Sequence, residues 1–481
     1  MTRTHLTSIA IALVAFACAA GIDAQGTPRS ADKVWHSKAE QGLSRDASAA
    51  PEAAYAVDPA KAYTLAELVD LAESHNPQTR VAWEAAKARA ASLGIARGAL
   101  FPTLAAVVLS GTERDAALIG QFYHRQTEGL YAPVLHVEYL VFDFGGRSGA
   151  IDAAKANLLA ADLAFNDTHR KIIFEVASAY YSLLNARGQR QAAEVSLKNA
   201  QTVEQDAESR LSNGLATKPD QLEATAARAQ ADYDLQAAIG NEDIAHGNLA
   251  TAMGLPPGTK IEVQPIEELP LPDKMAASVD EEIDRAFAER PDLLAQLAHV
   301  RAANAAIKQA RSSYFPTLSF SGDGGLARAY GQQDLLPGGY AEGEYWNVGL
   351  ELKWTLFDGT RREHQITEAI AERKAAQAEI DNLRDQIADE VWTAYSNMKT
   401  ALRQQQSAAA LLAASEQSYE AAHESYGYGV RSLLDVVSAQ KALAQARSED
   451  VLARSQLLFE VANLSFRTGD LIAVPPATTG P

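Results

Sequence analysis

The sequence has very little cysteine, no long apolar run beyond its N-terminal region and no excess of positive charge. Its 481 residues include a single cysteine, Cys18, which excludes a disulfide framework and a thiolate metal cluster. The formal net charge of −18 argues against binding to nucleic acid or to an anionic lipid surface, because both need basic patches. After residue 20 no stretch approaches about eighteen consecutive apolar residues, so the sequence predicts no transmembrane helix.

The sequence also lacks the common catalytic motifs. It contains no nucleophile elbow, no His-Glu-x-x-His zinc motif and no phosphate-binding loop. Gly-Asp-Gly-Gly at 322–325 indicates a loop rather than a nucleotide site, and the ten histidines are dispersed. We therefore expect a protein that is not an enzyme and that has no cofactor or metal centre.

The N-terminus has the layout of a secretory signal peptide, predicted to cover residues 1–24. A basic start precedes an apolar run at 6–20 that is too short to span a bilayer as a helix. Ala17-Cys18-Ala19 fits a small-x-small cleavage site, and Ile22-Asp23-Ala24 is a second candidate. Cys18 could alternatively be an acylated lipoprotein cysteine, although the residues before it fit that signal poorly. Either reading predicts an exported protein, which can cross a membrane only as a β-barrel.

The rest of the chain carries an internal duplication. Phe-Pro-Thr-Leu at 101–104 recurs at 315–318, 214 positions later, and Phe-Asp at 142–143 recurs at 357–358, 215 positions later. The same offset of 215 joins Gly214 with Gly429, Asp220 with Asp435, and Gly254 with Gly469. A register held over most of two halves predicts a duplicated domain, because the period is too long for a solenoid unit.

The duplication sets the predicted domain boundaries. They are the signal peptide 1–24, an N-terminal extension 25–61, the first repeat 62–260, a linker 261–277, the second repeat 278–472 and a C-terminal tail 473–481. Each repeat is predicted to contain a helix, two strands, a very long helix, a glycine turn and a returning helix. In the first repeat the opening helices are predicted at 65–74 and 77–97.

The long helices are predicted at 148–212 and 363–427. Both segments are rich in strong helix formers and contain no proline. About 65 helical residues extend roughly 100 Å. Helices of this length are typical of coiled coils or stacked tubes rather than globular domains.

The strands carry the most specific structural pattern. Residues 346–357 alternate apolar and polar side chains, with tryptophans near both ends, which is typical of a membrane-spanning β-strand. The segment 135–141 repeats this alternation, and 104–109 and 318–320 supply partner strands. One such strand alone would favour a soluble sandwich, whereas four among hundreds of helical residues favour a barrel.

Four strands cannot close a barrel, and open edges are not tolerated in lipid. The sequence therefore predicts oligomerisation, and a cyclic trimer would supply twelve strands around a water-filled lumen. The expected fold is an α+β membrane protein with four transmembrane strands per chain. These strands would contribute to a trimeric 12-stranded β-barrel that continues into a long α-helical barrel.

Residues 62–472 resemble the TolC-like outer-membrane efflux proteins, also called outer membrane factors. The resemblance rests on the duplication, the paired Phe-Pro-Thr-Leu strand starts, the Phe-Asp strand exits and the two glycine-marked turns. It implies a homotrimer in the lipid of the cell outer membrane, with a periplasmic helical domain. It also implies a periplasmic adaptor and an inner-membrane pump as partners, and a passive channel for drug or metal efflux.

Two alternatives stay open. A channel for type I protein secretion would have the same architecture, because the pump selects the cargo. A trimeric coiled-coil stalk or adhesin belongs to a different class and would show heptads without duplicated strand pairs.

The resemblance assigns roles to the two glycine turns. They match the tips to which adaptors dock, formed here by Gly214, Leu215 and Ala216 and by Gly429, Val430 and Arg431. Asp435 matches an acidic constriction in the periplasmic gate, and Asp220 with Arg431 matches a pair that locks the closed gate. The family's second aspartate is replaced by Ser438 in this sequence, which puts a second acidic ring in doubt. Without the resemblance, these glycines would be ordinary turn residues and these charges solvated.

Overall fold

The computed structural model describes residues 43–47, 57–119, 121–266, 269–272, 278–333 and 338–470. The chain divides into two compact units, Met1–Ala54 and Tyr55–Pro481. In the first unit, only the helical turn at 43–47 is described. The predicted signal peptide with Cys18 and the predicted C-terminal tail lie outside the described residues.

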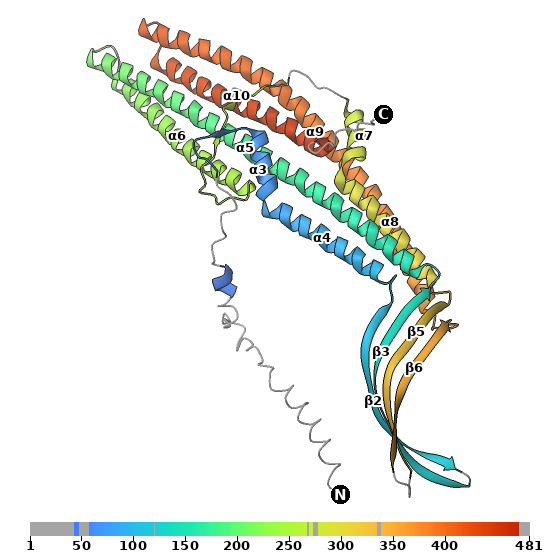
Figure 1. The fold of residues 1–481 in the computed structure, drawn as a ribbon. Helices are drawn as coiled ribbons and strands as arrows, with labels where there is room; N and C mark the ends of the chain where they lie inside the picture. Colours follow the sequence, from blue (N-terminus) through green and yellow to red (C-terminus); the bar gives the residue numbers. More distant parts are fainter. Residues whose placement is uncertain are drawn as a thin grey trace, which may run out of the picture. The chain divides into compact units, whose positions relative to one another are not determined.

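The second unit contains one series of elements twice, as the duplication predicts (Figure 1). The first copy consists of α3 (Leu65–His75), α4 (Pro77–Gly98), β2 (Thr103–Ile119), β3 (Phe122–Phe142), α5 (Gly146–Ser212) and α6 (Lys218–Ala252). The second consists of α7 (Val279–Glu289), α8 (Pro291–Ser312), β5 (Thr317–Gln333), β6 (Gly339–Lys353), α9 (Arg361–Gly427) and α10 (Leu433–Thr468). The short strands β1 (Ala62–Tyr63) and β4 (Glu262–Val263) pair in parallel. Helices α5 and α9 have 67 residues each, which confirms the predicted long helices.

Local signals fix where the opening helices begin. Thr64 caps α3 and Ser278 caps α7, each in a capping box with the glutamate three residues later. Proline occupies the first turn of α4 and α8, where its missing N–H has no partner to lose. Asn76 caps α4 with its side chain, whereas Arg290, at the equivalent position before α8, makes no side-chain cap. The guanidinium of Arg290 is thus available for other contacts.

The four long strands form one antiparallel sheet in the order β2-β3-β5-β6. Residues that pair across neighbouring strands lie on the same face of a sheet, so the register defines two faces. Leu104, Val137, Gly322 and Val348 form one continuous row across all four strands. We call the face that carries this row the apolar face.

The two faces of the sheet differ in chemistry. Val348, Leu350 and Leu352 lie on the apolar face and are 61%, 68% and 68% exposed in the single chain. On the opposite face, His136 Nδ1 lies 2.8 Å from Asp323 Oδ1. One exposed apolar face and one polar face suit a sheet with lipid on one side and water on the other.

Strand β6 differs from the strand predicted at 346–357. It covers Gly339–Lys353, so it begins earlier and ends before Trp354. Lys353 pairs with Thr317, and the next partner would be Pro316, which has no backbone N–H to donate. The ladder therefore stops while the apolar alternation continues along the sequence.

The other predicted strands were too short, and the loop predicted at 322–325 was wrong. Those residues lie inside β5, which runs for 17 residues. Gly325 marks a close approach of neighbouring strands, because a Cβ atom on this residue would clash with the carbonyl oxygen of Pro133. This glycine thus reflects strand packing, and the segment as a whole is not a turn.

The helices that join the sheet pack in the order of their strands. Helix α4 contacts α5, α5 contacts α8, and α8 contacts α9, while α6 and α10 return along α5 and α9. A Cβ atom on Gly149 of α5 would lie 2.8 Å from the backbone nitrogen of Gln309 on α8, so these two backbones approach closely. No helix in the described part of the chain is both long enough and apolar enough to cross a membrane.

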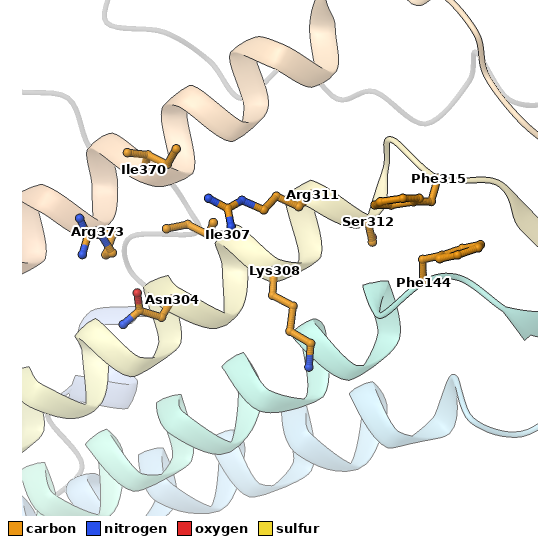
Figure 2. A pocket seen from close by; sticks show the side chains of 9 residues that line it. All are labelled: Phe144, Asn304, Ile307, Lys308, Arg311, Ser312, Phe315, Ile370 and Arg373. Atoms are coloured by element: carbon orange, nitrogen blue, oxygen red, sulfur yellow. The ribbon is translucent and has the colours of Figure 1, made fainter.

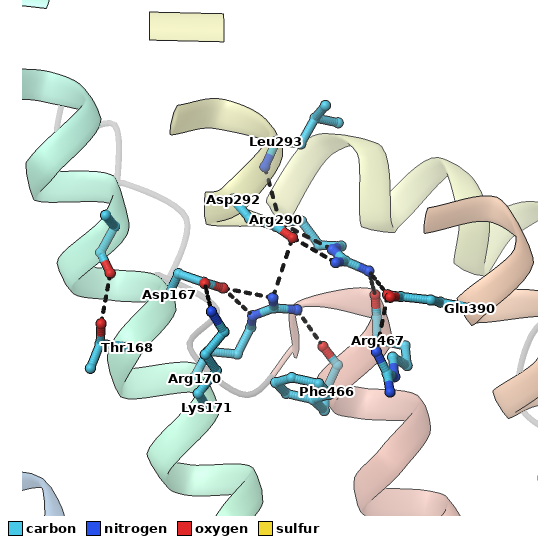
Figure 3. Close-up of polar contacts among 11 residues, drawn as sticks. Asp167, Thr168, Arg170, Lys171, Arg290, Asp292, Leu293, Glu390, Phe466 and Arg467 are labelled. Carbon is cyan, nitrogen blue, oxygen red and sulfur yellow. Dashed lines mark hydrogen bonds and ion pairs between the residues drawn. The ribbon is translucent and has the colours of Figure 1, made fainter. Parts of the chain in front are cut away.

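A buried network of charges joins four helices near the start of α8 (Figure 3). On α5, the side chain of Arg170 is 2% exposed. Its Nη2 donates to Asp167 Oδ1 at 2.6 Å, and its Nη1 donates to the Phe466 carbonyl of α10 at 2.8 Å. Arg170 also lies 3.6 Å from Asp292, at the first turn of α8.

Arg290 completes this network. It donates to Asp292 Oδ2 and to Glu390 Oε2 of α9, both at 2.6 Å, and Arg467 of α10 contacts the same Glu390 oxygen at 3.1 Å. Burial is the largest single influence on Asp292 and by itself would raise its pKa. The hydrogen bonds and charge of Arg290, the charge of Arg170 and the N–H of Leu293 together outweigh burial and lower that pKa. Such a network fixes the relative positions of its helices, because loss of one partner would leave a buried charge unpaired.

Candidate functional site

The candidate site consists of the two turns at which the long helices reverse. We call residues 213–217 tip 1 and residues 428–432 tip 2. Gly214 and Gly429 have φ angles of +75° and +77°, which glycine adopts without steric cost. In both tips the next residue donates its N–H to a carbonyl five positions earlier, at 2.8 Å and 2.9 Å, as in a Schellman motif. These contacts confirm the two predicted glycine turns.

Each tip is followed by a capping box that holds a carboxylate in place. Asp220 Oδ2 accepts hydrogen bonds from N and Oγ1 of Thr217 at 2.8 Å and 2.7 Å. Asp435 Oδ2 accepts from N and Oγ of Ser432 at 3.1 Å and 2.9 Å. These hydrogen bonds lower the pKa of both carboxyl groups below their usual values. Both groups are therefore ionised at neutral pH and held next to the turns.

Both tips expose apolar side chains. Leu215 in tip 1 is 74% exposed, and Val430 and Tyr428 in tip 2 are 79% and 85% exposed. In a Schellman motif the residue after the glycine frequently packs against the preceding helix. Here Leu215 and Val430 remain exposed, which leaves an apolar contact surface at each tip.

A buried tyrosine links the two tips. Tyr426 of α9 packs under the guanidinium of Arg210 of α5, with Cζ 4.3 Å from the ring centroid. Arg210 also donates to the Gly427 carbonyl. Burial raises the pKa of the Tyr426 hydroxyl, Arg210 opposes that shift, and the carboxylate of Asp220 adds to it. The hydroxyl is buried without a hydrogen-bond partner in the described chain, so it could accept one.

The structure brings the predicted gate residues to the same end of the helices. Within one chain, however, Asp220 is engaged by Thr217 rather than by Arg431. The guanidinium of Arg431 acts on Asp435, whose pKa it helps to lower. A contact between Asp220 and Arg431 therefore stays a prediction.

Sequence reasoning missed Arg210 and Tyr426. The one signal was Tyr-Gly-Tyr-Gly at 426–429, an unusual aromatic pair around a turn. The described residues contain no group of three or more His, Cys, Asp or Glu side chains that could hold a metal ion.

Comparison with known proteins identifies the family. The model of the outer membrane efflux protein family matches residues 68–255 and 283–470, one match for each copy. The chain belongs to the outer membrane efflux protein family. Protein CyaE of Bordetella pertussis is 28% identical over 411 residues, which cover 85% of this chain and 84% of CyaE.

Further similarity to the family extends over most of the chain. The alkaline protease secretion protein AprF of Pseudomonas aeruginosa is 24% identical over 420 residues, covering 83% of each protein. The crystal structure of a membrane protein from Pseudomonas aeruginosa has a TM-score of 0.73 and 24% identity, covering 84% of this chain and 90% of that chain.

These findings confirm the resemblance, the internally duplicated α+β fold and the location that the sequence predicted. The efflux protein lies in the cell outer membrane, and its long helices form a periplasmic domain. Because the sheet and the tips lie at opposite ends of α5 and α9, the tips lie at the periplasmic end of the molecule.

Proposed function

We propose that three copies of this chain form a passive channel through the outer membrane. The observation that carries this proposal is the sheet, in which β2 and β6 are edge strands. An exposed apolar face requires lipid, and lipid does not tolerate open edges. Pairing β6 of one copy with β2 of the next would close twelve strands, with the apolar face outward and the polar face toward water.

The channel would be one part of a three-component export system. A periplasmic adaptor and an inner-membrane pump would deliver the substrate and supply the energy. Leu215 and Val430 are suited to contact the adaptor, because they expose apolar surface at the two tips. The family's description as efflux proteins supports efflux, and the similarity to the cation efflux system protein CusC of Escherichia coli supports metal ions as one class of substrate. Family membership argues against the coiled-coil stalk, which would have no duplicated strand pairs.

Type I protein secretion is the second candidate. The observation in its favour is AprF, a protein named for secretion of a protease, which aligns with 83% of this chain. Deletion of the gene separates the two candidates. Efflux predicts increased sensitivity to drugs or metal ions with an unchanged set of secreted proteins, whereas secretion predicts the loss of one or a few secreted proteins.

The assembly itself is tested by native mass spectrometry and conductance. Protein solubilised in detergent should have three times the protomer mass and should form ion-conducting pores in planar bilayers. A monomer or a dimer, or a trimer that does not conduct after reconstitution, would overturn the proposed channel.

We further propose that the tips close the channel at rest. Asp220 of tip 1 would pair with Arg431 of tip 2, three times around the ring, and Asp435 would form a ring of negative potential that favours cations. An exposed ion pair contributes at most about 1 kcal/mol. Three pairs acting together could change the open population about a hundredfold.

Single-channel recording tests this gate. Arg431→Ser and Asp220→Ala should raise the resting conductance, whereas Asp435→Asn should mainly reduce cation selectivity. Thr217→Ala is the matched control, because it removes the hydroxyl from the capping box but keeps the Asp220 charge. If both lock variants conduct like the parent, or if Thr217→Ala raises conductance equally, the pair does not hold the gate closed.

A further inference from the structure

A cavity of about 530 Å³ lies between α8 and α9, close to their junction with the sheet (Figure 2). We call it the α8–α9 cavity. Three of its nine lining residues are cations, Lys308, Arg311 and Arg373, and none is acidic. This is the opposite of the chain as a whole, which has 61 acidic and 43 basic residues. The cavity therefore concentrates positive charge within an acidic protein.

Two of the three cations differ from Lys308 in having no ion-pair or hydrogen-bond partner among the described residues. Lys308 Nζ reaches toward α5, where it lies 3.2 Å from Asp152 Oδ2. In the part of the chain that the structure describes, no ion pair or hydrogen bond engages the guanidinium of Arg311 or of Arg373. Arg373 is moreover half-buried. A half-buried guanidinium that has no counterion among the described residues keeps its N–H donors available for an anion from outside the chain.

The wall of the cavity nearest the sheet is aromatic. The rings of Phe144 and Phe315 are stacked, with centroids 4.9 Å apart, and Phe142 meets Phe144 edge to face at 4.7 Å. Phe142 pairs with Leu318, and Leu318 pairs with Leu352 on the apolar face. The aromatic wall thus continues the apolar face of the sheet down to the cations.

Exposed aromatic residues surround the same junction. Phe101 lies just before β2, and Trp354 and Phe357 lie just after β6. Their side chains are 70%, 60% and 80% exposed. Aromatic side chains concentrate at the interface between the hydrocarbon core and the lipid headgroups. Since the apolar face ends at this belt, the cations of the cavity lie at the level of the headgroups on the periplasmic side.

We propose that the α8–α9 cavity binds the phosphate group of a phospholipid in the periplasmic leaflet of the outer membrane. Arg311 and Arg373 hold the phosphate oxygens, because a guanidinium matches phosphate with paired N–H donors. Phe144 and Phe315 contact the glycerol and the first methylene groups of the acyl chains. The net negative charge of the chain opposes general adsorption to an anionic surface, but a single cationic cavity binds one headgroup at a time. The inference rests on insertion of the sheet into the membrane, which is part of the proposed function.

Native mass spectrometry with added phosphatidylglycerol tests the site. The test variant is Arg311→Gln with Arg373→Gln. The control is Arg301→Gln with Lys374→Gln, which removes the same charge from exposed positions of α8 and α9 that do not line the cavity. The test variant should bind this lipid roughly 30-fold more weakly than the parent, since two basic contacts are lost. The control should bind like the parent, and each single variant should be intermediate.

Three outcomes decide the matter. Equal lipid binding by parent, test and control proteins would overturn the site. Displacement of the lipid by an equal concentration of inorganic phosphate would overturn the lipid as its occupant, because a free phosphate would then suffice. Selective loss in the test variant, measured on trimers that conduct normally, would support it. Failure to obtain conducting trimers of the parent would instead count against the proposed channel, so the two failures are distinguishable.

Discussion

Tip 1 and tip 2 share a backbone but differ in how they are attached to the helices around them. Both have a left-handed glycine and a capping box at equivalent positions. Yet Leu433 and Val436, just after tip 2, are 2% and 0% exposed. Their equivalents after tip 1 are Lys218, which is exposed, and Gln221, which is half-buried.

The difference shows which features of a duplicated turn are interchangeable. The glycine that ends one helix and the capping box that starts the next act through the main chain and one short polar side chain, so they form in both copies. Anchoring depends on an apolar cluster that tip 2 shares with Val203 and Ala207 of α5 and Ala224 of α6. This single cluster lies between the two tips. The residues just after tip 2, Leu433 and Val436, belong to the cluster, whereas their equivalents just after tip 1 do not.

The largest expected effect separates the two tips. Leu433→Ala should lower the local free energy of opening at the start of α10 by about 2–5 kcal/mol, because it removes a buried side chain. Lys218→Ala, at the equivalent exposed position, should change the start of α6 by less than about 0.5 kcal/mol. Hydrogen exchange of the amides in both segments measures this. Similar changes at the two sites would mean that the tips are anchored equally.

Alanine substitution of the turn glycines should destabilise the two tips by similar amounts. At Gly214 and Gly429 a Cβ atom would meet nothing within 4 Å, so the cost of alanine is conformational. Each substitution should destabilise its own tip by about 1–2 kcal/mol. Gly240→Ala is the control, because this glycine lies within α6 and its surroundings are equally open. There alanine should stabilise the helix by about 0.5–1 kcal/mol, the opposite of its effect at the tips. A much larger effect at one tip would reveal a contact made only in the assembled channel.

The smallest expected effect concerns pH, and it should again be alike in the two tips. The capping hydrogen bonds lower the pKa of Asp220 and of Asp435. A carboxylate with a lowered pKa stabilises the folded state above its unfolded pKa of about 4, and this contribution is lost as the pH falls through the folded value. The protection of the tip amides against hydrogen exchange, measured relative to the intrinsic rate at each pH, should therefore fall between about pH 5 and pH 3. Asp220→Asn and Asp435→Asn should each abolish this pH-dependent loss of protection at their own tip.

The helical part of the fold was predictable because its signals are local. Capping boxes, first-turn prolines and turn glycines mark most helix ends in the sequence, and the predicted ends lie within about two residues of those observed. The strands were less predictable. The end of β6 depends on Pro316 in the neighbouring strand, and alternation within residues 346–357 contains no information about that partner.

The site was predictable in part for the same reason. Gly214, Gly429 and the two aspartates belong to short motifs, and the sequence placed them at the turns. Arg210 and Tyr426 meet only after the first pair of long helices packs against the second, and the contacts of Arg170 with Phe466 and of Arg290 with Glu390 likewise require tertiary packing. Contacts between residues that are a hundred or more positions apart leave no periodicity in either segment.

The buried charge network near the start of α8 has a mechanical consequence. Arg170 of α5 contacts Asp292 of α8 and the Phe466 carbonyl of α10. It lies roughly forty residues before α5 ends at Ser212. At the rise of an α-helix, the distance along α5 from Arg170 to tip 1 is about 60 Å. A rotation of α5 by about 5° about Arg170 would displace tip 1 by about 5 Å. A displacement of about 5 Å at tip 1 therefore requires only a small rotation of α5 at the charge network, with α10, which is hydrogen-bonded to Asn185 and Gln189 of α5, moving together with it.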